Sequence, residues 1–429
     1  MDEVLLKAMK SPSPLYFLGL FMAISAFVFG LVLPLLYQSL YGMGVAGINN
    51  PVGWGVYITN FVFWVGIAHS GTLISAVLFL FRSKFRSKFN RSAEAMTVIA
   101  VLTAGLFPLI HIGRIWVFYY LIPYPNQRQL WVNFRSPLIW DVFAVNTYLT
   151  VSTIFFYVGL IPDLATVRAK AEGIRKWAYG ILSLGWSGNQ KQWRHYTRAY
   201  LFLAAFATPL VISVHSVVSW DFAMGVVPGW HTTIFAPYFV AGAIFSGCAM
   251  VLTLVIPMRK VFGLEKYITI DDFEALTKLL MVTSMIVGYS YLVELGLAFY
   301  SSDAPFEAQQ FLYRMTGDYK FTYWLMIFCN VVVPLTLFAK PLRRNIIYLF
   351  IVSIFVNIGM WLERFNIIVI SLSKEFNPYA WGLYSPSWVE IFITIGSFGF
   401  FFTLFLLFSK LLPVIAISEV KEVVTLKHH

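Results

Sequence analysis

The chain has 429 residues, of which 59% are hydrophobic and only 12% are charged, and its formal net charge is +11. Soluble proteins carry about 25% charged residues, so this composition indicates a polytopic membrane protein and argues against a soluble enzyme or a nucleic-acid-binding protein. Cys248 and Cys329 lie in apolar stretches and form no ligand motif, so we expect no iron–sulfur or zinc site in this chain.

Ten apolar stretches are long enough to cross a hydrocarbon core of about 30 Å. The sequence therefore predicts an all-α polytopic membrane protein with ten transmembrane helices. The shortest stretch is the eighth, which also contains Pro334. The ten are expected near residues 15–37, 55–81, 95–121, 137–160, 198–220, 233–256, 276–300, 321–340, 345–371 and 388–412.

Alternate loops between these stretches differ in positive charge. One set carries about 22 lysines and arginines and the other about 5, a bias that the positive-inside rule explains if the first set is cytoplasmic. Both termini are then expected in the cytoplasm. The weakly charged segments expected on the outer side are 38–54, 122–136, 221–232, 301–320 and 372–387.

An internal repeat relates the two halves of the chain. Gly53-Trp54 recurs as Gly229-Trp230, and a following pattern recurs at the same offset of about 176 residues. We predict two four-helix bundles in parallel repeat, spans 2–5 and 6–9, flanked by spans 1 and 10. The matched residues of the pattern are Phe63, Gly66, Ser70 and Gly71 with Phe239, Gly242, Ser246 and Gly247. The predicted units are 1–52, 53–220, 221–371 and 372–429.

Ionisable residues border the hairpin between spans 3 and 4. His111 and Arg114 precede it and Asp141 follows it, and ionisable groups inside hydrocarbon are costly enough to suggest a function. An antiparallel hairpin can bring His111 and Asp141 to similar depth, with Trp140 as one aromatic wall. Oxidising a quinol requires such walls for the ring and proton acceptors for its two hydroxyls. A structural hydrogen bond between helices, about 0.6 kcal/mol in membranes, is the alternative for the pair. Arg114 alternatively extends its charge to the interface.

Other polar residues lie deeper in predicted spans. His69 either relays protons or is a satisfied buried histidine, whereas Asp221 and His231 border the outer loop and are expected to be solvated. Glu294 and Arg364 need partners at their depth. Glu363 is one candidate for a structural ion pair, and contact with a quinone headgroup is the alternative.

Electron transfer from a quinol needs a second redox centre. The histidines offer no pair at matched depth on different helices, so no bound haem is expected. A partner with clusters or haems is therefore implied. The aromatic hairpin 116–140 is either a docking surface for it on the outer side or an aromatic belt at the membrane interface.

Three segments carry a family resemblance: GWGVYITNFVFWVGIAHSG, FPLIHIGRIW and SPLIWDVFAVNTY. They resemble the integral quinone-binding subunits of the NrfD/PsrC type, most of all the ActC subunits of bacterial alternative complex III, with the sister subunit ActF similar. The resemblance covers nearly the whole chain. It implies two stacked four-helix bundles, no bound haem, and a menaquinol pocket near the outer face of the bacterial cytoplasmic membrane.

The resemblance also assigns roles and partners. The quinol-site histidine and aspartate of the family fall on His111 and Asp141, and an arginine contact falls on Arg364. His69, Asp221 and Glu294 are candidates for a proton path across the membrane. The chain would act as one subunit of a quinol oxidoreductase, inactive alone. Expected partners are an ActB-like iron–sulfur subunit on the periplasmic side, other membrane and cytochrome c subunits, and a terminal oxidase.

Two other functions fit the sequence. A secondary transporter would suit parallel repeats and intramembrane charges, but Pro108 and Pro334 interrupt spans at positions that are not equivalent. A purely structural anchor would tether an extrinsic redox protein, with His111 and Asp141 joining two helices.

Overall fold

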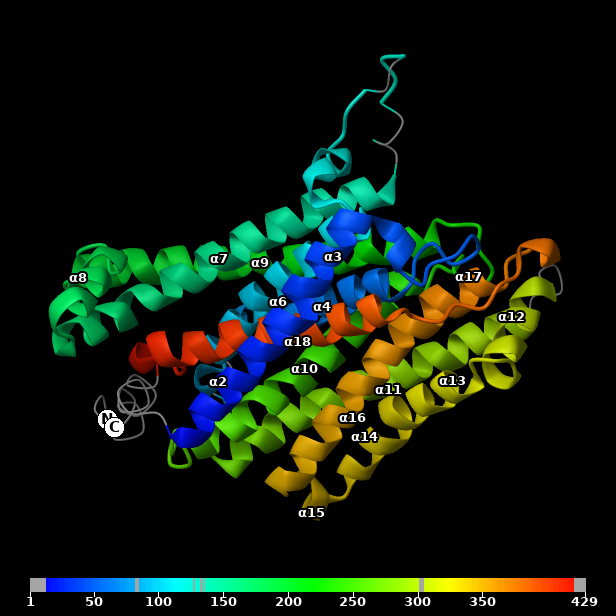
Figure 1. Cartoon of the computed structure of the whole chain (residues 1–429). Coiled ribbons are helices and arrows are strands. Elements are labelled where there is room, and N and C mark those ends of the chain that lie inside the picture. Colours follow the sequence, from blue (N-terminus) through cyan, green and yellow to red (C-terminus); the bar gives the residue numbers. More distant parts are fainter. Residues whose placement is uncertain are drawn as a thin grey trace.

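The computed structural model describes residues 13–81, 85–125, 128–131, 134, 136–300 and 305–419. Regular structure in these ranges is helical throughout (Figure 1), and within them ten helical segments are long and apolar enough to cross a membrane. The predicted fold class is therefore confirmed. The ten segments are Pro14–Tyr41, Val56–Leu80, Asn90–His111, Pro137–Lys170, Gln190–Ala223, Phe235–Val261, Ile270–Tyr300, Lys320–Phe338, Ile346–Ser373 and Trp388–Leu411.

Among the described spans, six are uninterrupted helices and four contain a π-helical turn. The uninterrupted helices are α6 (Asn90–His111), α7 (Pro137–Lys170), α9 (Gln190–Ala223), α10 (Phe235–Val261), α11 (Ile270–Tyr300) and α18 (Trp388–Leu411). The π turns are Phe27–Val32 between α2 (Pro14–Ala26) and α3 (Leu33–Tyr41), Leu73–Val77 between α4 (Val56–Thr72) and α5 (Leu78–Leu80), Phe328–Val332 between α13 (Lys320–Ile327) and α14 (Val333–Leu335), and Asn366–Ile370 between α16 (Ile346–Phe365) and α17 (Ser371–Ser373). Such turns often mark functional positions in helices.

Shorter helices connect the spans. Three of them are α-helices: α8 (Gly173–Leu182), α12 (Pro305–Thr316) and α15 (Lys340–Arg343). The 3-10 turns are Met43–Val45, Phe85–Lys88, Ile115–Leu121, Thr336–Phe338 and Pro378–Ala380.

The third span differs from its expected limits of 95–121. Helix α6 begins at Asn90 and ends at His111, ten residues before the predicted end. Gly113 follows with a φ of +86°, in the left-handed region that glycine adopts without strain, and this residue terminates the helix. A side chain at Gly113 would collide with Met43, because a Cβ atom there would lie 2.6 Å from Met43 Cγ. The aromatic residues 115–121 therefore lie outside the long helix.

The buried helices α4 and α10 cross at the centre of the molecule. Their contact depends on small residues, since a Cβ atom on Gly247 would lie 2.0 Å from Ser70 Oγ and 2.9 Å from the Ile67 carbonyl oxygen. Close approach of this kind replaces the hydrophobic effect, which does not drive helix association within lipid. At one end of the crossing, the indole rings of Trp54 and Trp230 stack with centroids 5.7 Å apart.

The remaining spans surround this centre. Helices α4, α6, α7 and α9 contact one another in sequence, as do α10, α11, the α13–α14 segment and α16. Spans 1 and 10 pack together through Gly30 and Gly396, where a Cβ atom on Gly396 would lie 2.1 Å from Leu31 N. The repeat symmetry and the predicted boundaries 1–52, 53–220, 221–371 and 372–429 remain predictions.

Consecutive spans run in opposite directions, so each connecting loop lies on one of two sides of the molecule. We call the side with the turn 85–88, α8 and α15 the basic side, and the opposite side, with residues 42–55, 112–125, 224–234 and 374–387, the aromatic side. After α18 the chain stays on the basic side, where Val414–Ile417 are buried. Ser92 Oγ donates a hydrogen bond to the Val414 carbonyl oxygen at 2.8 Å, which fixes this C-terminal segment against α6. The compartment that each side faces remains a prediction.

Candidate functional site

Two buried carboxyl groups face each other near the aromatic side. Asp141 lies in the second turn of α7 and Asp221 lies near the end of α9, with 4% and 7% of their surfaces exposed. The two groups are close enough for a hydrogen bond between them when one is protonated. None of their four oxygens accepts a hydrogen bond from another described residue. Buried acceptors without donors are uncommon and identify this pair as a candidate site.

Aromatic side chains flank the carboxyl pair. Trp140 and Trp220 directly precede Asp141 and Asp221, and their rings meet edge to face with centroids 6.3 Å apart. Trp140 Nε1 donates a hydrogen bond of 3.2 Å to the Phe134 carbonyl oxygen. The same dipeptide, Trp-Asp, thus occurs near the aromatic ends of two neighbouring antiparallel helices. This repetition is the sequence signal that would have pointed to Asp221 as the partner of Asp141.

His111 and Arg114 lie at the end of α6. His111 is half-buried and its Nδ1 has no hydrogen-bond partner among the described residues, while Arg114 is exposed. Within the described part of the chain, no hydrogen bond or ion pair joins His111 to Asp141. The structure therefore brings Asp221 to Asp141, and the predicted roles of His111 and Arg114 remain predictions.

A pair of histidines occupies the interior of the first helix group. The rings of His69 on α4 and His215 on α9 lie 4.5 Å apart, and Tyr148 on α7 stacks on His69 at 5.1 Å. His69 Nδ1 lies 2.5 Å from the Val65 carbonyl oxygen, so it carries the hydrogen, and Nε2 is left without a partner. Neither ring nitrogen of His215 has a partner among the described residues. Imidazole nitrogens without a partner are candidate proton acceptors.

Arg364 connects the histidines with the second helix group. Its guanidinium lies 4.2 Å from the centroid of the Phe239 ring, which in turn lies 5.8 Å from the His215 ring. It forms an ion pair of 2.9 Å with Glu363, as the sequence suggested, and both side chains are at most 2% exposed. The hydroxyl of Tyr291 donates a hydrogen bond to Glu363. A π-helical turn begins two residues after Arg364 and alters the helix at this point.

Glu294 lies between an enclosed chamber and an open cavity. The chamber offers about 20 Å³ to the centres of water molecules, enough for one water, and is lined by Glu294, Glu363 and Arg314 among others. The cavity, of about 610 Å³, is lined by Glu294, His231 and Glu307 on the aromatic side. Burial raises the pKa of Glu307, against the opposing effect of the Gly229 N–H that it accepts at 2.7 Å. Glu294 is thus the carboxyl group that both spaces share.

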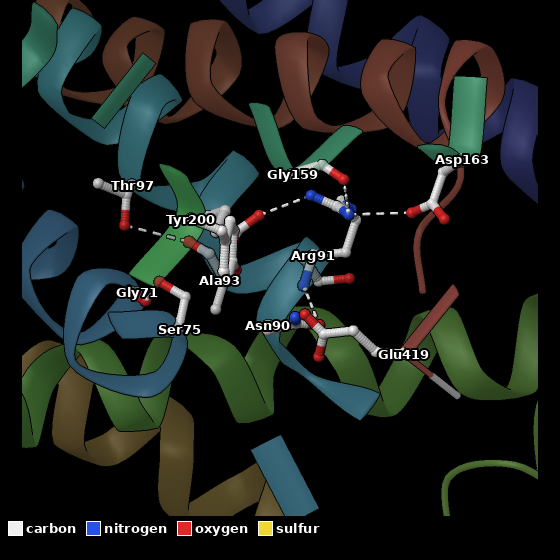
Figure 2. A network of polar contacts seen from close by, with 12 residues as sticks. Gly71, Ser75, Asn90, Arg91, Ala93, Thr97, Gly159, Asp163, Tyr200 and Glu419 are labelled. Carbon is white, nitrogen blue, oxygen red and sulfur yellow. Dashed lines mark hydrogen bonds and ion pairs between the residues drawn. The ribbon is translucent and has the colours of Figure 1, made fainter. Parts of the chain in front are cut away.

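A network of buried charges on the basic side was not predicted. Arg91, 1% exposed, forms ion pairs of 2.8 Å with Glu94 and 2.9 Å with Asp163 (Figure 2). In the sequence, Arg91 was counted only as one of the about 22 lysines and arginines whose distribution predicts the orientation. The signals that identify the network are the spacing of Arg91 and Glu94, three residues apart on one helix, and Asp163 within an apolar stretch.

Metal ligands do not gather within the part of the chain that the structure describes. In those ranges no three His, Cys, Asp or Glu side chains form a group that could hold a metal ion. The ionisable groups that the structure brings together are carboxyl and imidazole groups, which can accept protons.

This architecture defines an integral membrane protein of ten spans with paired ionisable groups buried between its helices. The profile of the family described as polysulphide reductase, NrfD, matches residues 44–373, and the chain belongs to that family. The family membership predicted from the sequence is confirmed.

Three relatives extend the comparison. The chain is 29% identical over 387 residues to a putative membrane subunit of dimethyl sulfoxide reductase from Halobacterium salinarum, covering 84% of this chain and 83% of the relative. It is 22% identical over 403 residues to an Hdr-like menaquinol oxidoreductase integral membrane subunit of Archaeoglobus fulgidus, covering 89% and 90%. It is 21% identical over 408 residues to a selenate reductase subunit of Mesobacillus selenatarsenatis, with the same coverage. All three names describe subunits of oxidoreductases.

Proposed function

We propose that this chain is the membrane subunit of a quinol-oxidising complex and that quinol binds beside Asp141 and Asp221. The observation that supports this most is the pair of carboxyl groups, which are buried without donors and directly follow two tryptophans whose rings contact each other. The named functions of the relatives, one of them a menaquinol oxidoreductase, favour a quinol as the substrate and menaquinol in particular. The chain itself would not be active alone.

The residues fit the proton chemistry of the reaction. Oxidising a quinol releases two electrons and two protons, and each hydroxyl needs an acceptor within hydrogen-bonding distance. Asp141 accepts one proton, directly or through Asp221, and His111 at the neighbouring end of α6 accepts the second. Trp140 and Trp220 provide aromatic surface for the ring. Arg114 borders the site from the turn after α6, and Arg364 contributes positive charge from a deeper position.

Protons then leave the site along buried polar groups. We propose that His69, Asp221 and Glu294 belong to this path. His215 and Phe239 lie between His69 and Arg364, and the chamber beyond Glu363 holds space for one water next to Glu294. The cavity of about 610 Å³ gives Glu294 an exit toward the aromatic side.

Electrons pass to a partner protein on the aromatic side. The segment after α6 exposes large aromatic side chains there, including Trp116 at 58% and Trp131 at 55% exposure. Exposed aromatic surface of this kind is typical of protein interfaces. We propose an iron–sulfur subunit of the ActB type as the occupant, within an assembly like alternative complex III that also contains cytochrome c and other membrane subunits. The aromatic side would then be the periplasmic side of a bacterial cytoplasmic membrane.

A quinone-analogue titration tests the proposal. The purified complex is titrated with 2-heptyl-4-hydroxyquinoline N-oxide, whose fluorescence is quenched on binding, in wild-type, Asp141→Asn and Asp318→Asn forms. Asp318 is exposed on the aromatic side and bonds only to Tyr313 among the described residues, so its variant controls for charge removal. We expect saturable binding that Asp141→Asn weakens at least tenfold and Asp318→Asn leaves unchanged. No saturable binding, or equal binding in all three forms, would support a purely structural anchor instead.

A further inference from the structure

Among the described residues, the network of buried charges on the basic side has an unequal number of acids and bases. We define the inner charge cluster as Arg86, Arg91, Glu94, Asp163, Tyr200 and Glu419. Arg91 forms ion pairs with Glu94 and Asp163, and Arg86 forms an ion pair of 2.9 Å with Glu419. Figure 2 labels Arg91, Asp163, Tyr200 and Glu419. The cluster therefore holds one more carboxyl group than guanidinium groups.

Five elements of the described chain surround the cluster and set this balance. The turn 85–88 contributes Arg86, α6 contributes Arg91 and Glu94, α7 contributes Asp163, and the C-terminal segment contributes Glu419. Helix α9 contributes only Tyr196 and Tyr200, which are neutral as phenols. Burying an uncompensated charge is unfavourable, so the cluster is balanced when it binds one proton.

Glu419 is the carboxyl group of the cluster with the fewest partners. Glu94 accepts from both Arg91 and the Tyr200 hydroxyl, at 2.8 Å and 2.7 Å, and Asp163 accepts from Arg91 and from Ser418 N. Among the described residues, the ion pair that Glu419 forms is with Arg86. Burial raises the pKa of Glu419, and the nearby positive charge of Arg86 opposes that shift. Protonation of Glu419 thus costs the cluster the fewest contacts.

The outer surface of the cluster lies close to an open space on the basic side. A cavity of about 390 Å³ opens on the basic side, and its wall includes Pro162, Ile417 and Ser418. Ser418 N donates a hydrogen bond of 3.1 Å to Asp163 Oδ1, so this wall directly contacts the cluster. The C-terminal segment consequently lies between solvent and the buried charges.

Hydroxyl groups lie on the inner surface of the cluster. Thr97 follows Glu94 by one turn of α6, and its Oγ1 donates 2.8 Å to the Ala68 carbonyl oxygen. The Tyr148 hydroxyl donates to the same carbonyl oxygen at 3.0 Å and bonds with Thr72 Oγ1 at 2.7 Å. Tyr148 stacks on His69, so the hydroxyl groups of Thr97, Thr72 and Tyr148 lie between the helical turn that carries Glu94 and the histidine pair.

We propose that the inner charge cluster is a proton-binding site that takes one proton from water on the basic side through Glu419 and holds it next to Glu94 and Tyr200. Its use in proton transfer to His69 rests on the proposed function, whereas its occupancy does not. The step transfers H⁺ from hydronium to a carboxylate oxygen and forms water and a carboxylic acid, with no redox change. A solely structural network would keep its carboxyl groups ionised over the whole working pH range.

Infrared spectroscopy of the intact complex in lipid nanodiscs tests the site. The carbonyl stretch of protonated carboxylic acid is followed against pH in wild-type, Glu419→Gln, Glu94→Gln and Glu265→Gln forms. Glu265 is exposed in the loop after α10 on the same side and serves as the matched control. We expect a band equivalent to about one proton that disappears at alkaline pH, is lost in Glu419→Gln or Glu94→Gln, and persists in Glu265→Gln.

The outcomes separate this proposal from the quinol site. Quinol oxidation with a soluble dye is measured on the same samples, and we expect Glu419→Gln to keep it within twofold of wild type. A band that neither cluster variant changes would overturn the proton-binding site, whatever the quinol activity. Absent quinol oxidation in wild type with the band intact would overturn the proposed function and leave this site standing. If the Glu94→Gln complex does not assemble, the Glu419→Gln variant still decides the result, because Glu419 lies outside the membrane spans.

Discussion

Replacing Asp221 by asparagine tests the carboxyl pair more sharply than replacing Asp141, because sequence reasoning alone did not place Asp221 at the site. The amide is nearly the same size but cannot accept a proton from quinol. Positioned acid–base groups contribute about 10²–10⁴ in rate, which corresponds to about 2.7–5.4 kcal/mol of transition-state free energy. We expect Asp221→Asn and Asp141→Asn each to lower the rate of quinol oxidation by at least about 100-fold.

Stability should change little in these variants, because neither carboxyl group accepts a hydrogen bond from a donor in the described residues. The double variant should lose less than the product of the two single losses, since residues that act as a unit are not additive. The assay is stopped-flow oxidation of a naphthoquinol by the purified complex, with Asp318→Asn as control. An Asp221→Asn complex that assembles and turns over within twofold of wild type would refute the pairing.

Further predictions concern packing and pH. Gly247→Ala should lower the free energy of unfolding by about 1–3 kcal/mol, because a Cβ atom at position 247 would lie 2.0 Å from Ser70 Oγ. Adding Ser70→Gly should recover part of this loss, and thermal unfolding in detergent measures both variants. Trp230→Phe should cost about 1–3 kcal/mol in the same assay, since it leaves the Ile367 carbonyl oxygen without its 2.7 Å donor. Burial raises the pKa of Glu419 above its unfolded value, so the folded state binds this proton more tightly. Protonated Glu419 therefore stabilises the docked C-terminal segment at low pH, and this stabilisation is lost as the pH rises through the folded pKa. Hydrogen exchange of residues 413–419 as a function of pH measures the effect. The Glu419→Gln variant should show a weaker pH dependence of that exchange.

Much of the fold was predictable because apolar length alone identifies a membrane span. The ten spans and the family follow from that pattern and from short segments such as FPLIHIGRIW. The end of α6 was not predictable in the same way, because Ile115–Leu121 is as apolar as a helix interior. Gly113 ends the helix through its backbone conformation and its contact with Met43, and hydropathy does not register either.

The site was predictable in its residues more than in its pairings. Asp141 and His69 stood out as ionisable groups in apolar stretches, but which partner each meets depends on helix rotation and crossing. Asp221 was placed near an outer loop, while the structure buries it against Asp141. Arg91 was counted as a loop cation, while it is buried with Glu94 and Asp163. Positive charge in a loop and positive charge in a buried cluster look alike in a sequence.

Photoaffinity labelling with an azido-naphthoquinone tests the central claim most directly. The probe is irradiated on the intact complex, and labelled peptides are identified by mass spectrometry with and without excess unlabelled quinone. The account predicts competed labelling in the segments 137–145 of α7 and 215–223 of α9, which carry the two Trp-Asp pairs. Competed labelling confined to other helices, with both of these segments unmodified, would contradict it.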